Sequence, residues 1–328
     1  MAILVTGGLG YVGSHAVKML VDSGHEVVSY DSLLFGHKEA SSGSAVVVGD
    51  LLDLAKLNET FDKYPIDAVM HFAALADVGD SVRNPHRYYS VNVTGSLNLL
   101  QAMMEHDVKH LVFSSSAAVF GEPEVVPIPE DHPKNPTNPY GRSKLMFEEI
   151  LAEADHAYGV KSVSLRYFNA SGADPSGLIG EDHTPEHHLL PIVLQVALGQ
   201  REKVTVFGDD WDTPDGSCVR DYVHVTDLAQ AHLLALSYLK NGGATSVYNM
   251  GNGSGYSVKE VIELSAEIAG RKIMSVTGPR RPGDPARLVA SSDKIKRELG
   301  WSPRFPELKT IVKTAWDWHS SHPKGYAG

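Results

Sequence analysis

The chain opens with a short apolar segment that runs directly into a cluster of glycines, and this junction constrains the fold more than any other part of the sequence. Residues 3–5 are Ile-Leu-Val, and residues 6–13 read TGGLGYVG. The spacing of Gly7, Gly10 and Gly13 suits a tight turn, a close approach of the backbone to a pyrophosphate, and a helix packed closely on the strand. The amino end of such a helix offers free N–H groups to phosphate oxygens. The sequence therefore predicts a strand, loop and helix that bind a dinucleotide.

The first half of the chain alternates short apolar runs with longer amphipathic segments. This alternation is typical of a parallel sheet that is buried on both faces by helices. The expected strands are residues 2–5, 26–31, 45–49, 68–73, 110–114 and 161–166. The expected helices are residues 11–23, 54–64, 87–107 and 139–158. We therefore expect an α/β fold with a Rossmann-type, doubly wound parallel sheet.

After about residue 168 the sequence changes character. Gly, Pro, Asp and His are frequent there, and residues 169–186 and 208–216 are expected to form long loops, which usually carry function in a compact chain. We expect residues 1–168 to form the dinucleotide-binding domain, with some later segments returning to it. Residues 169–328 are expected to form mainly a smaller α/β domain that binds the substrate.

Composition narrows the classes of partner. The 29 Lys and Arg against 40 Asp and Glu give a net charge of -11, which disfavours binding to nucleic acid or to an anionic membrane surface. An anionic small ligand would therefore need a locally basic pocket. The single cysteine, Cys218, excludes an intramolecular disulfide and suits a reducing compartment, so we expect a cytoplasmic protein.

Two carboxylates at the ends of expected strands bear on the choice of dinucleotide. Asp31 closes the second strand, where a carboxylate accepts hydrogen bonds from both ribose hydroxyls and repels a 2′-phosphate. Asp50 closes the third strand and is placed to meet the adenine edge, although it could equally be a solvated acid. Asp31 therefore favours NAD over NADP.

A tyrosine and a lysine lie four residues apart at the start of an expected helix. Tyr140 and Lys144 project from one face, and the nearby ammonium, together with a positively charged nicotinamide, favours the phenolate. Tyr140 could then exchange a proton with a sugar hydroxyl while hydride moves to the cofactor. Ser116, at the end of an apolar strand, can share that proton. The alternative for the Tyr-Lys pair alone is an ordinary pair on a helix surface, but the glycine loop, the serine and the pair in this order favour a catalytic site.

These features together resemble the UDP-glucose 4-epimerase family of the extended short-chain dehydrogenase/reductase superfamily. The resemblance covers essentially the whole chain. Its narrower motifs are HFAA at 71–74, NVTG at 92–95, YGRSKLM at 140–146, LRYFN at 165–169, GED at 180–182, TPDG at 213–216, VRDYVH at 219–224 and RRPGD at 280–284. The resemblance implies an NAD-dependent isomerase that interconverts UDP-galactose and UDP-glucose by transient oxidation at C4, rotation of the 4-keto sugar and re-reduction. It also implies a homodimer formed through the helices at 87–107 and 139–158.

The resemblance also implies which residues form the site. Ser116, Tyr140 and Lys144 match the catalytic residues. The implied NAD contacts are Gly7, Gly10, Tyr11, Val12, Gly13, Asp31, Asp50, Leu51, Phe72, Ala73, Ala74, Asn92, Tyr140, Lys144, Tyr167 and Phe168. The implied UDP-sugar contacts are Ser116, Tyr140, Asn169, His188, Leu189, Phe207, Arg220, Arg281 and Asp284. Independently, the forked donors of two arginines are what a pyrophosphate needs, although a single arginine is more often a surface ion-pair partner.

Departures from related patterns refine the expected chemistry. Ala117 and Ala118 stand where related sugar-nucleotide dehydratases carry an acid/base pair, so elimination of water has no evident catalyst. Ala76 stands where many family members have a lysine that reaches the cofactor. Leu288 aligns with a position that controls the room around the sugar, and its size argues weakly against N-acetyl substituents.

Several alternatives stay open. The substrate could be another UDP-sugar, either UDP-xylose/UDP-arabinose or a UDP-N-acetylhexosamine, and a catalytically silent NAD-binding protein is a more distant reading. The 16 histidines include the pair His187 and His188, but the sequence has no His-Glu-x-x-His motif and no cysteine partner for them. We therefore expect no metal site.

Overall fold

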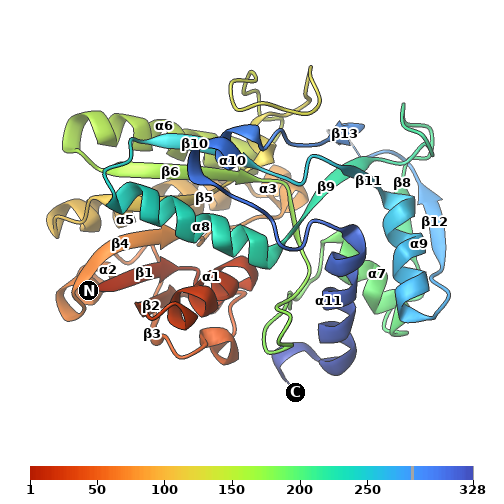
Figure 1. The fold of residues 1–328 in the computed structure, drawn as a ribbon, viewed down its shortest axis with the longest axis horizontal. Coiled ribbons are helices and arrows are strands. Elements are labelled where there is room, and N and C mark those ends of the chain that lie inside the picture. Colours follow the sequence, from red (N-terminus) through yellow and green to blue (C-terminus); the bar gives the residue numbers. More distant parts are fainter. Residues whose placement is uncertain (282–283, 328) are drawn as a thin grey trace.

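The computed structural model describes residues 1–281 and 284–327, and a seven-stranded parallel sheet dominates it (Figure 1). The strand order is β10-β6-β5-β4-β1-β2-β3, and every neighbouring pair is parallel. The strands are β1 (Ala2–Thr6), β2 (Glu26–Asp31), β3 (Ala45–Val48), β4 (Ile66–His71), β5 (His110–Ser116), β6 (Lys161–Tyr167) and β10 (Ser246–Met250). The predicted Rossmann-type α/β fold class is confirmed. The order reverses between β1 and β4, which is where such sheets bind nucleotides.

Helices cover both faces of this sheet. On one face, α1 (Tyr11–Asp22) and α8 (Val225–Lys240) pack on Ile3 and Val5 of β1. On the other face, α2 (Leu54–Lys63), α5 (Gly95–Glu105) and α6 (Pro139–Tyr158) share a core with Leu4. Successive side chains of a strand point to opposite faces, so an all-apolar β1 serves both cores.

The single helix expected at 87–107 is interrupted. A helix α3 (Val78–Arg83) is followed by α4 (Pro85–Tyr89), a π-helical segment (Ser90–Thr94) and then α5. Apolar periodicity cannot reveal one extra residue in a turn, because the chain stays helical on both sides of it. Such π-helical segments occur frequently at functional sites.

The remaining elements form a smaller region beside the large sheet (Figure 1). Its centre is β9 (Val219–His224), which pairs with β7 (Asn169–Ser171), β11 (Gly255–Ser257) and β13 (Arg287–Leu288). A second, two-stranded sheet joins β8 (Val204–Phe207) to β12 (Ser275–Gly278). The helices of this region are α7 (Leu189–Ala197), α9 (Val258–Ala269) and α11 (Leu308–Ser321), and they share apolar cores.

Three segments of the second half return to the first. Strand β10 extends the large sheet next to β6, α8 covers one of its faces, and α10 (Asp293–Leu299) contributes Ile295 to the same core. The domain boundary at residue 168 therefore stays a prediction. Short 3₁₀ turns complete the chain at Lys38–Ser41, Ala117–Val119 and Gly325–Ala327. Within the described residues, no helix is both long and apolar enough to cross a membrane.

Candidate active site

The glycine loop lies directly against the carboxyl end of β4. Gly7 has a φ of +68°, and a Cβ placed on it would come within 2.5 Å of the Ala73 nitrogen. A Cβ on Gly13 would lie 2.0 Å from the Gly7 carbonyl oxygen, so α1 can begin this close to the loop only with glycine there. No side chain of the described residues caps the start of α1, which leaves its first N–H groups directed toward the loop. This arrangement fits the phosphates of a dinucleotide.

Strand ends on both sides of the loop carry the next two predicted cofactor residues. Asp31 is buried, and its carboxylate accepts hydrogen bonds from the backbone N–H of Leu9 (3.0 Å) and of Leu33 (2.8 Å). Burial raises the pKa of Asp31, although these two N–H donors oppose the shift. Asp50 is exposed and accepts from the N–H of Leu52 at 2.9 Å. Asp31 is thus fixed beside the glycine loop, whereas Asp50 faces solvent.

His71 closes β4 at the point where the strand order reverses. Its Nδ1 lies 2.7 Å from the Thr6 hydroxyl at the end of β1, and its Nε2 lies 2.8 Å from the Ser96 hydroxyl on α5. Burial lowers the pKa of His71 to about 3, and the Lys144 ammonium acts in the same direction. A neutral His71 therefore ties both strand ends to α5.

Asn92 occupies the π-helical segment. Its side-chain oxygen accepts from the N–H of Leu75 (2.8 Å), and its Nδ2 donates to the Leu75 carbonyl and to the Ser143 hydroxyl, both at 3.0 Å. Ser143 belongs to α6 and donates to the Tyr140 carbonyl at 2.7 Å. The predicted cofactor residue Asn92 thereby joins the loop after β4 to the helix that carries Tyr140.

Helix α6 presents its functional side chains along one stripe. Asn138 caps the helix by accepting from the N–H of Gly141, and Pro139 occupies the first turn, so the start of the helix is well defined. Tyr140, Lys144 and Glu148 follow at intervals of four residues and are all buried. Residues at this spacing lie above one another on a helix. The stripe faces the carboxyl end of β5.

Lys144 is held by the end of β5. Its Nζ donates to the Ser114 carbonyl at 2.8 Å and lies 4.8 Å from the centre of the Phe113 ring. Burial lowers the pKa of Lys144 to about 7, against the opposing effect of the Glu148 carboxylate. The same ammonium lies 5.9 Å from the centre of the Tyr140 ring.

Tyr140 and Ser116 complete the predicted catalytic group. Burial raises the pKa of Tyr140, and a hydrogen bond with the Ser116 side chain opposes this shift. The Ser116 hydroxyl also accepts from the N–H of Ala118 at 3.1 Å, at the start of a 3₁₀ turn. The structure therefore brings Ser116, Tyr140 and Lys144 together in a desolvated site, where the protonation of Tyr140 depends on its immediate neighbours.

A buried charge network supports this group, and sequence reasoning missed it. Glu148 accepts from Arg166 Nη2 at 2.5 Å and Nε at 2.9 Å, and from the Ser115 hydroxyl at 2.5 Å. Tyr167 lies with its hydroxyl 2.6 Å from that of Ser114. The signal in the sequence was a charged residue on each of two apolar surfaces, one on the helix at 139–158 and one in the strand at 161–166, because buried charges need partners.

The predicted phosphate-binding residues gather at the edge of the smaller region. Asp284 lies 2.9 Å from Arg281 Nε and 3.8 Å from Arg220 Nη2. Arg220 also donates to the carbonyls of Val219 and Pro285, and the Arg281 guanidinium lies 4.6 Å from the centre of the Phe207 ring. Residues 282 and 283 of the RRPGD motif lie outside the described residues.

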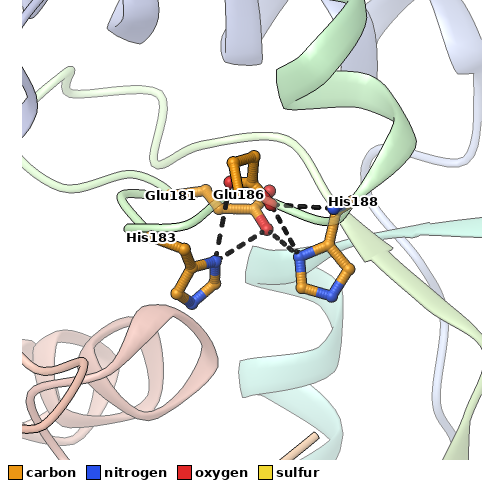
Figure 2. A group of neighbouring side chains, drawn as sticks. All are labelled: Glu181, His183, Glu186 and His188. Atoms are coloured by element: carbon orange, nitrogen blue, oxygen red, sulfur yellow. Dashed lines mark hydrogen bonds and ion pairs between the residues drawn. The ribbon is translucent and has the colours of Figure 1, made fainter. Parts of the chain in front are cut away.

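Three further predicted substrate residues lie where the chain enters the smaller region. Asn169 begins β7 and pairs with Tyr222 of β9. His188 immediately precedes α7, and Leu189 packs in the cores of the smaller region. His188 directs its Nδ1 toward Glu181, 2.7 Å away, an arrangement that the sequence analysis did not anticipate (Figure 2).

The other predicted cofactor residues surround the reversal point of the sheet. Gly10 and Val12 lie at the start of α1, whereas the Tyr11 hydroxyl donates to the Gly172 carbonyl at 2.7 Å. The residues that follow β3, β4 and β6, or end them, are Leu51, Phe72, Ala73, Ala74, Tyr167 and Phe168. They line the same edge as the glycine loop, because the carboxyl ends of parallel strands share one edge.

Comparisons with known proteins agree with this geometry. Residues 3–251 match the NAD dependent epimerase/dehydratase family. The chain is similar to the UDP-glucose 4-epimerase of Halalkalibacterium halodurans, with 54% identity over 100% of this chain and 98% of the relative. A crystal structure of a UDP-glucose 4-epimerase shares 52% identity at a TM-score of 0.97, covering 99% of both chains. The UDP-glucose 4-epimerase of Bifidobacterium longum, solved in complex with NAD+ and UDP, shares 40% identity at a TM-score of 0.94 and covers 99% of this chain and 100% of its own.

Proposed function

The chain belongs to the NAD-dependent epimerase/dehydratase family, and from this premise we propose that it is an isomerase that interconverts UDP-galactose and UDP-glucose by 4-epimerisation. The resemblance found in the sequence is confirmed. One juxtaposition supports the proposal most directly. Ser116, Tyr140 and Lys144 meet beyond β5, at the edge that also carries the glycine loop.

The residues of this group divide the chemistry among them. NAD, when bound, takes a hydride from C4 of the sugar and returns it, so the reaction has no net redox change. Tyr140 removes the proton of the C4 hydroxyl, and Ser116 holds that hydroxyl through a second hydrogen bond. The Lys144 ammonium stabilises the phenolate of Tyr140, which burial alone would disfavour.

The arginines of the smaller region fit the nucleotide half of the substrate. Arg220 and Arg281 supply a local positive charge on a protein of net charge -11, and Asp284 orients both guanidinium groups. Contacts to a pyrophosphate leave the sugar free to turn about it. A 4-keto sugar that presents either face to C4 re-reduction needs this freedom.

The turn after Ser116 favours epimerisation over dehydration within this family. Ala117 and Ala118 form the 3₁₀ turn directly after Ser116, and both side chains are methyl groups. Elimination of water across C5 and C6 needs an acid and a base beside the reacting carbons. These positions supply neither, so oxidation and re-reduction at C4 is the chemistry that the turn supports.

Leu288 bears on the choice of sugar. It lies in β13 opposite Arg220 and packs against the apolar cluster of Val119, Phe120 and Leu145, next to the turn that follows Ser116. Its side chain thus stands between the serine segment and the arginine strand. This position favours a hexose without an N-acetyl group.

We expect the enzyme to act as a homodimer. Leu97 on α5 is 42% exposed, and Met146 and Ile150 on α6 are only partly buried. Apolar side chains on these two helices suit a four-helix contact with a second copy. Light scattering at micromolar concentration checks this, and a monomer there contradicts the dimer.

Proton NMR of the purified protein tests the proposed function. The protein is incubated separately with UDP-galactose, UDP-N-acetylgalactosamine and UDP-xylose, first without and then with added NAD. We expect conversion of UDP-galactose to UDP-glucose, with little turnover of the other two sugars. Turnover only after NAD is added would identify Ala76 as a cause of weak cofactor retention. No turnover under either condition would contradict the epimerase assignment.

A further inference from the structure

A second cluster of chemically active side chains lies away from Tyr140, in the loop that precedes α7. Glu181, His183, Glu186 and His188 point toward one another (Figure 2). One potential ligand atom from each lies within 4.8 Å of all the others. Two imidazole nitrogens and two carboxylate oxygens form a donor set that suits zinc and similar divalent ions.

The distances within the cluster are close to those around a metal ion. His183 Nδ1 lies 3.4 Å from Glu181 Oε1 and 3.7 Å from Glu186 Oε2, and His188 Nδ1 lies 3.3 Å from Glu186 Oε1. In a tetrahedral zinc site with ligand bonds of about 2.0–2.2 Å, neighbouring ligand atoms are about 3.3–3.6 Å apart. Only the separation of 2.7 Å between His188 Nδ1 and Glu181 Oε1 would need to widen.

Two atoms of the cluster lack a hydrogen bond although they are buried. Glu181 is 4% exposed, and neither its Oε1 nor His183 Nδ1 has a partner of acceptable hydrogen-bond geometry among the described residues. A buried polar atom without a partner costs about 1–3 kcal/mol, and more when it is charged. A cation between the four groups would satisfy both atoms at once.

The surrounding chain fixes one of the carboxylates. Glu186 Oε1 accepts from the backbone N–H of His187 (2.7 Å) and of His188 (2.8 Å), which holds Oε2 toward His183. Hydrogen bonds of this kind orient metal ligands in many proteins. A polar cavity of about 220 Å³ borders Glu181, His183 and Glu186, and it gives an ion a path to the cluster.

We propose that Glu181, His183, Glu186 and His188 bind one divalent transition-metal ion, zinc above all. Four protein ligands close the coordination shell, so the site is structural, and the epimerisation chemistry stays at Tyr140. The ion would fasten the loop at 181–188 to the start of α7. Ligation through Nδ1 leaves His188 Nε2 free, and it is this nitrogen that would meet the UDP-sugar if the proposed function holds.

The site departs from the sequence-based expectation of no metal ion. Its ligands follow the spacing Glu-x-His-x-x-Glu-x-His within one loop, without cysteine and without the helical His-Glu-x-x-His pattern. In a loop, residue spacing does not fix which side chains converge. The coordinates supply that information.

The rival arrangement is a network of ion pairs without metal. Burial disfavours charge on both imidazoles, but the Glu181 and Glu186 carboxylates outweigh it and raise the pKa of His183 to about 9. They raise the pKa of His188 in the same way. Two protonated histidines could thus balance two carboxylates, and the experiment must separate protons from metal.

Metal analysis of untagged, full-length protein makes this separation. The protein is purified without chelator from zinc-supplemented cells and measured by plasma mass spectrometry. It is then treated with EDTA and titrated with Co²⁺, which absorbs visible light when it is bound tetrahedrally. We expect about one equivalent of zinc per chain, and a Co²⁺ spectrum that zinc abolishes. An apoprotein that takes up neither ion would overturn the proposal.

Matched variants locate the site. His183→Asn and Glu181→Gln are expected to lose most of the bound zinc and the Co²⁺ spectrum, since each removes one of four ligands. His187→Asn is the control, because His187 lies beside the cluster but pairs with Asp77 at 3.1 Å. Circular dichroism and NAD binding check the fold of each variant. Full zinc content in both ligand variants would place the metal elsewhere and refute the site.

The EDTA-treated wild type gives a readout that does not depend on any variant. Zinc is expected to raise its melting temperature, because an ion that binds only the folded chain stabilises it. His183→Asn should show no such rise. This outcome is independent of turnover, so failure of the metal site and failure of the proposed epimerase function are distinguishable.

Discussion

The two sides of the candidate active site are prepared for their ligands in opposite ways. On the side of the large sheet, Tyr140 and Lys144 are buried, and Lys144 already has a hydrogen-bond partner. On the side of the smaller region, the Arg281 side chain is 58% exposed, and it pairs with Asp284 at the surface. Groups whose protonation must be tuned are thus desolvated and fixed in advance. Groups that neutralise a charged ligand stay in water until it arrives.

The largest expected effect falls on the buried side. Tyr140→Phe removes the phenol that exchanges the proton with the sugar, and we expect the turnover number to fall at least about 100-fold. The dissociation constant for UDP should stay unchanged, because the arginines are untouched. Progress curves with UDP-galactose and calorimetry with UDP measure the two quantities.

Tyr158→Phe is the matched control for this experiment. Tyr158 ends the same helix and is exposed, so its loss should leave both quantities at the wild-type level. Near-normal turnover of Tyr140→Phe would remove the proposed role of Tyr140.

The exposed side should show the reverse separation. Arg281→Ala deletes a charged donor for the pyrophosphate, worth about 2 kcal/mol, and we expect the dissociation constant of UDP to rise about 30-fold. NAD binding should not change. Calorimetry with each ligand tests both statements.

The neighbouring arginine provides the control. Arg280 is held by Asp210 at 2.7 Å and lies over the Trp211 ring, so Arg280→Ala should affect UDP binding far less. Equal losses in the two variants would mean that general surface charge, and not a specific contact of Arg281, holds the nucleotide.

The smallest effect concerns acid stability, and it sharpens the contrast in burial. Burial lowers the pKa of His15 to about 4, of His71 to about 3 and of His232 to about 4, and all three belong to elements of the large sheet region. The unfolded chain binds protons near pH 6.5 that these folded sites refuse. The stability they provide is therefore complete above pH 6.5 and falls as the pH drops toward 4, by up to about 1.4 kcal/mol per pH unit for each histidine.

Urea unfolding at pH 7.5, 6.5 and 5.5 measures this slope. His71→Asn should make it shallower by the share of one histidine, whatever it does to stability at neutral pH. His156→Asn, on the exposed side of α6, is the control. An unchanged slope in His71→Asn would show that His71 takes up its proton in the folded protein.

The same contrast explains which features could be predicted from the sequence. The strand at 26–31 and the helix at 139–158 have their predicted bounds, because buried parallel strands and a capped helix carry their signals locally. The strands β7, β11 and β13 have three, three and two residues, and their partner β9 is distant in sequence. No local pattern predicts such pairing.

The candidate site divides in the same way. Tyr140, Lys144 and Ser116 could be inferred from one helix and one strand. The grouping of Arg220, Arg281 and Asp284 depended on the family resemblance, since three residues from separate segments meet only in the folded chain. The partnership of Glu148 with Arg166 needed coordinates for the same reason.

The return of β10 to the large sheet has a consequence during synthesis on the ribosome. When residues 1–168 have emerged, β6 is an unpaired edge strand, and the face that α8 covers is still bare. Such an edge and such a face invite association with other chains. The nascent nucleotide-binding half must therefore wait for residues 225–250 before it is complete, and a fragment cut at residue 168 is expected to aggregate when it is expressed alone.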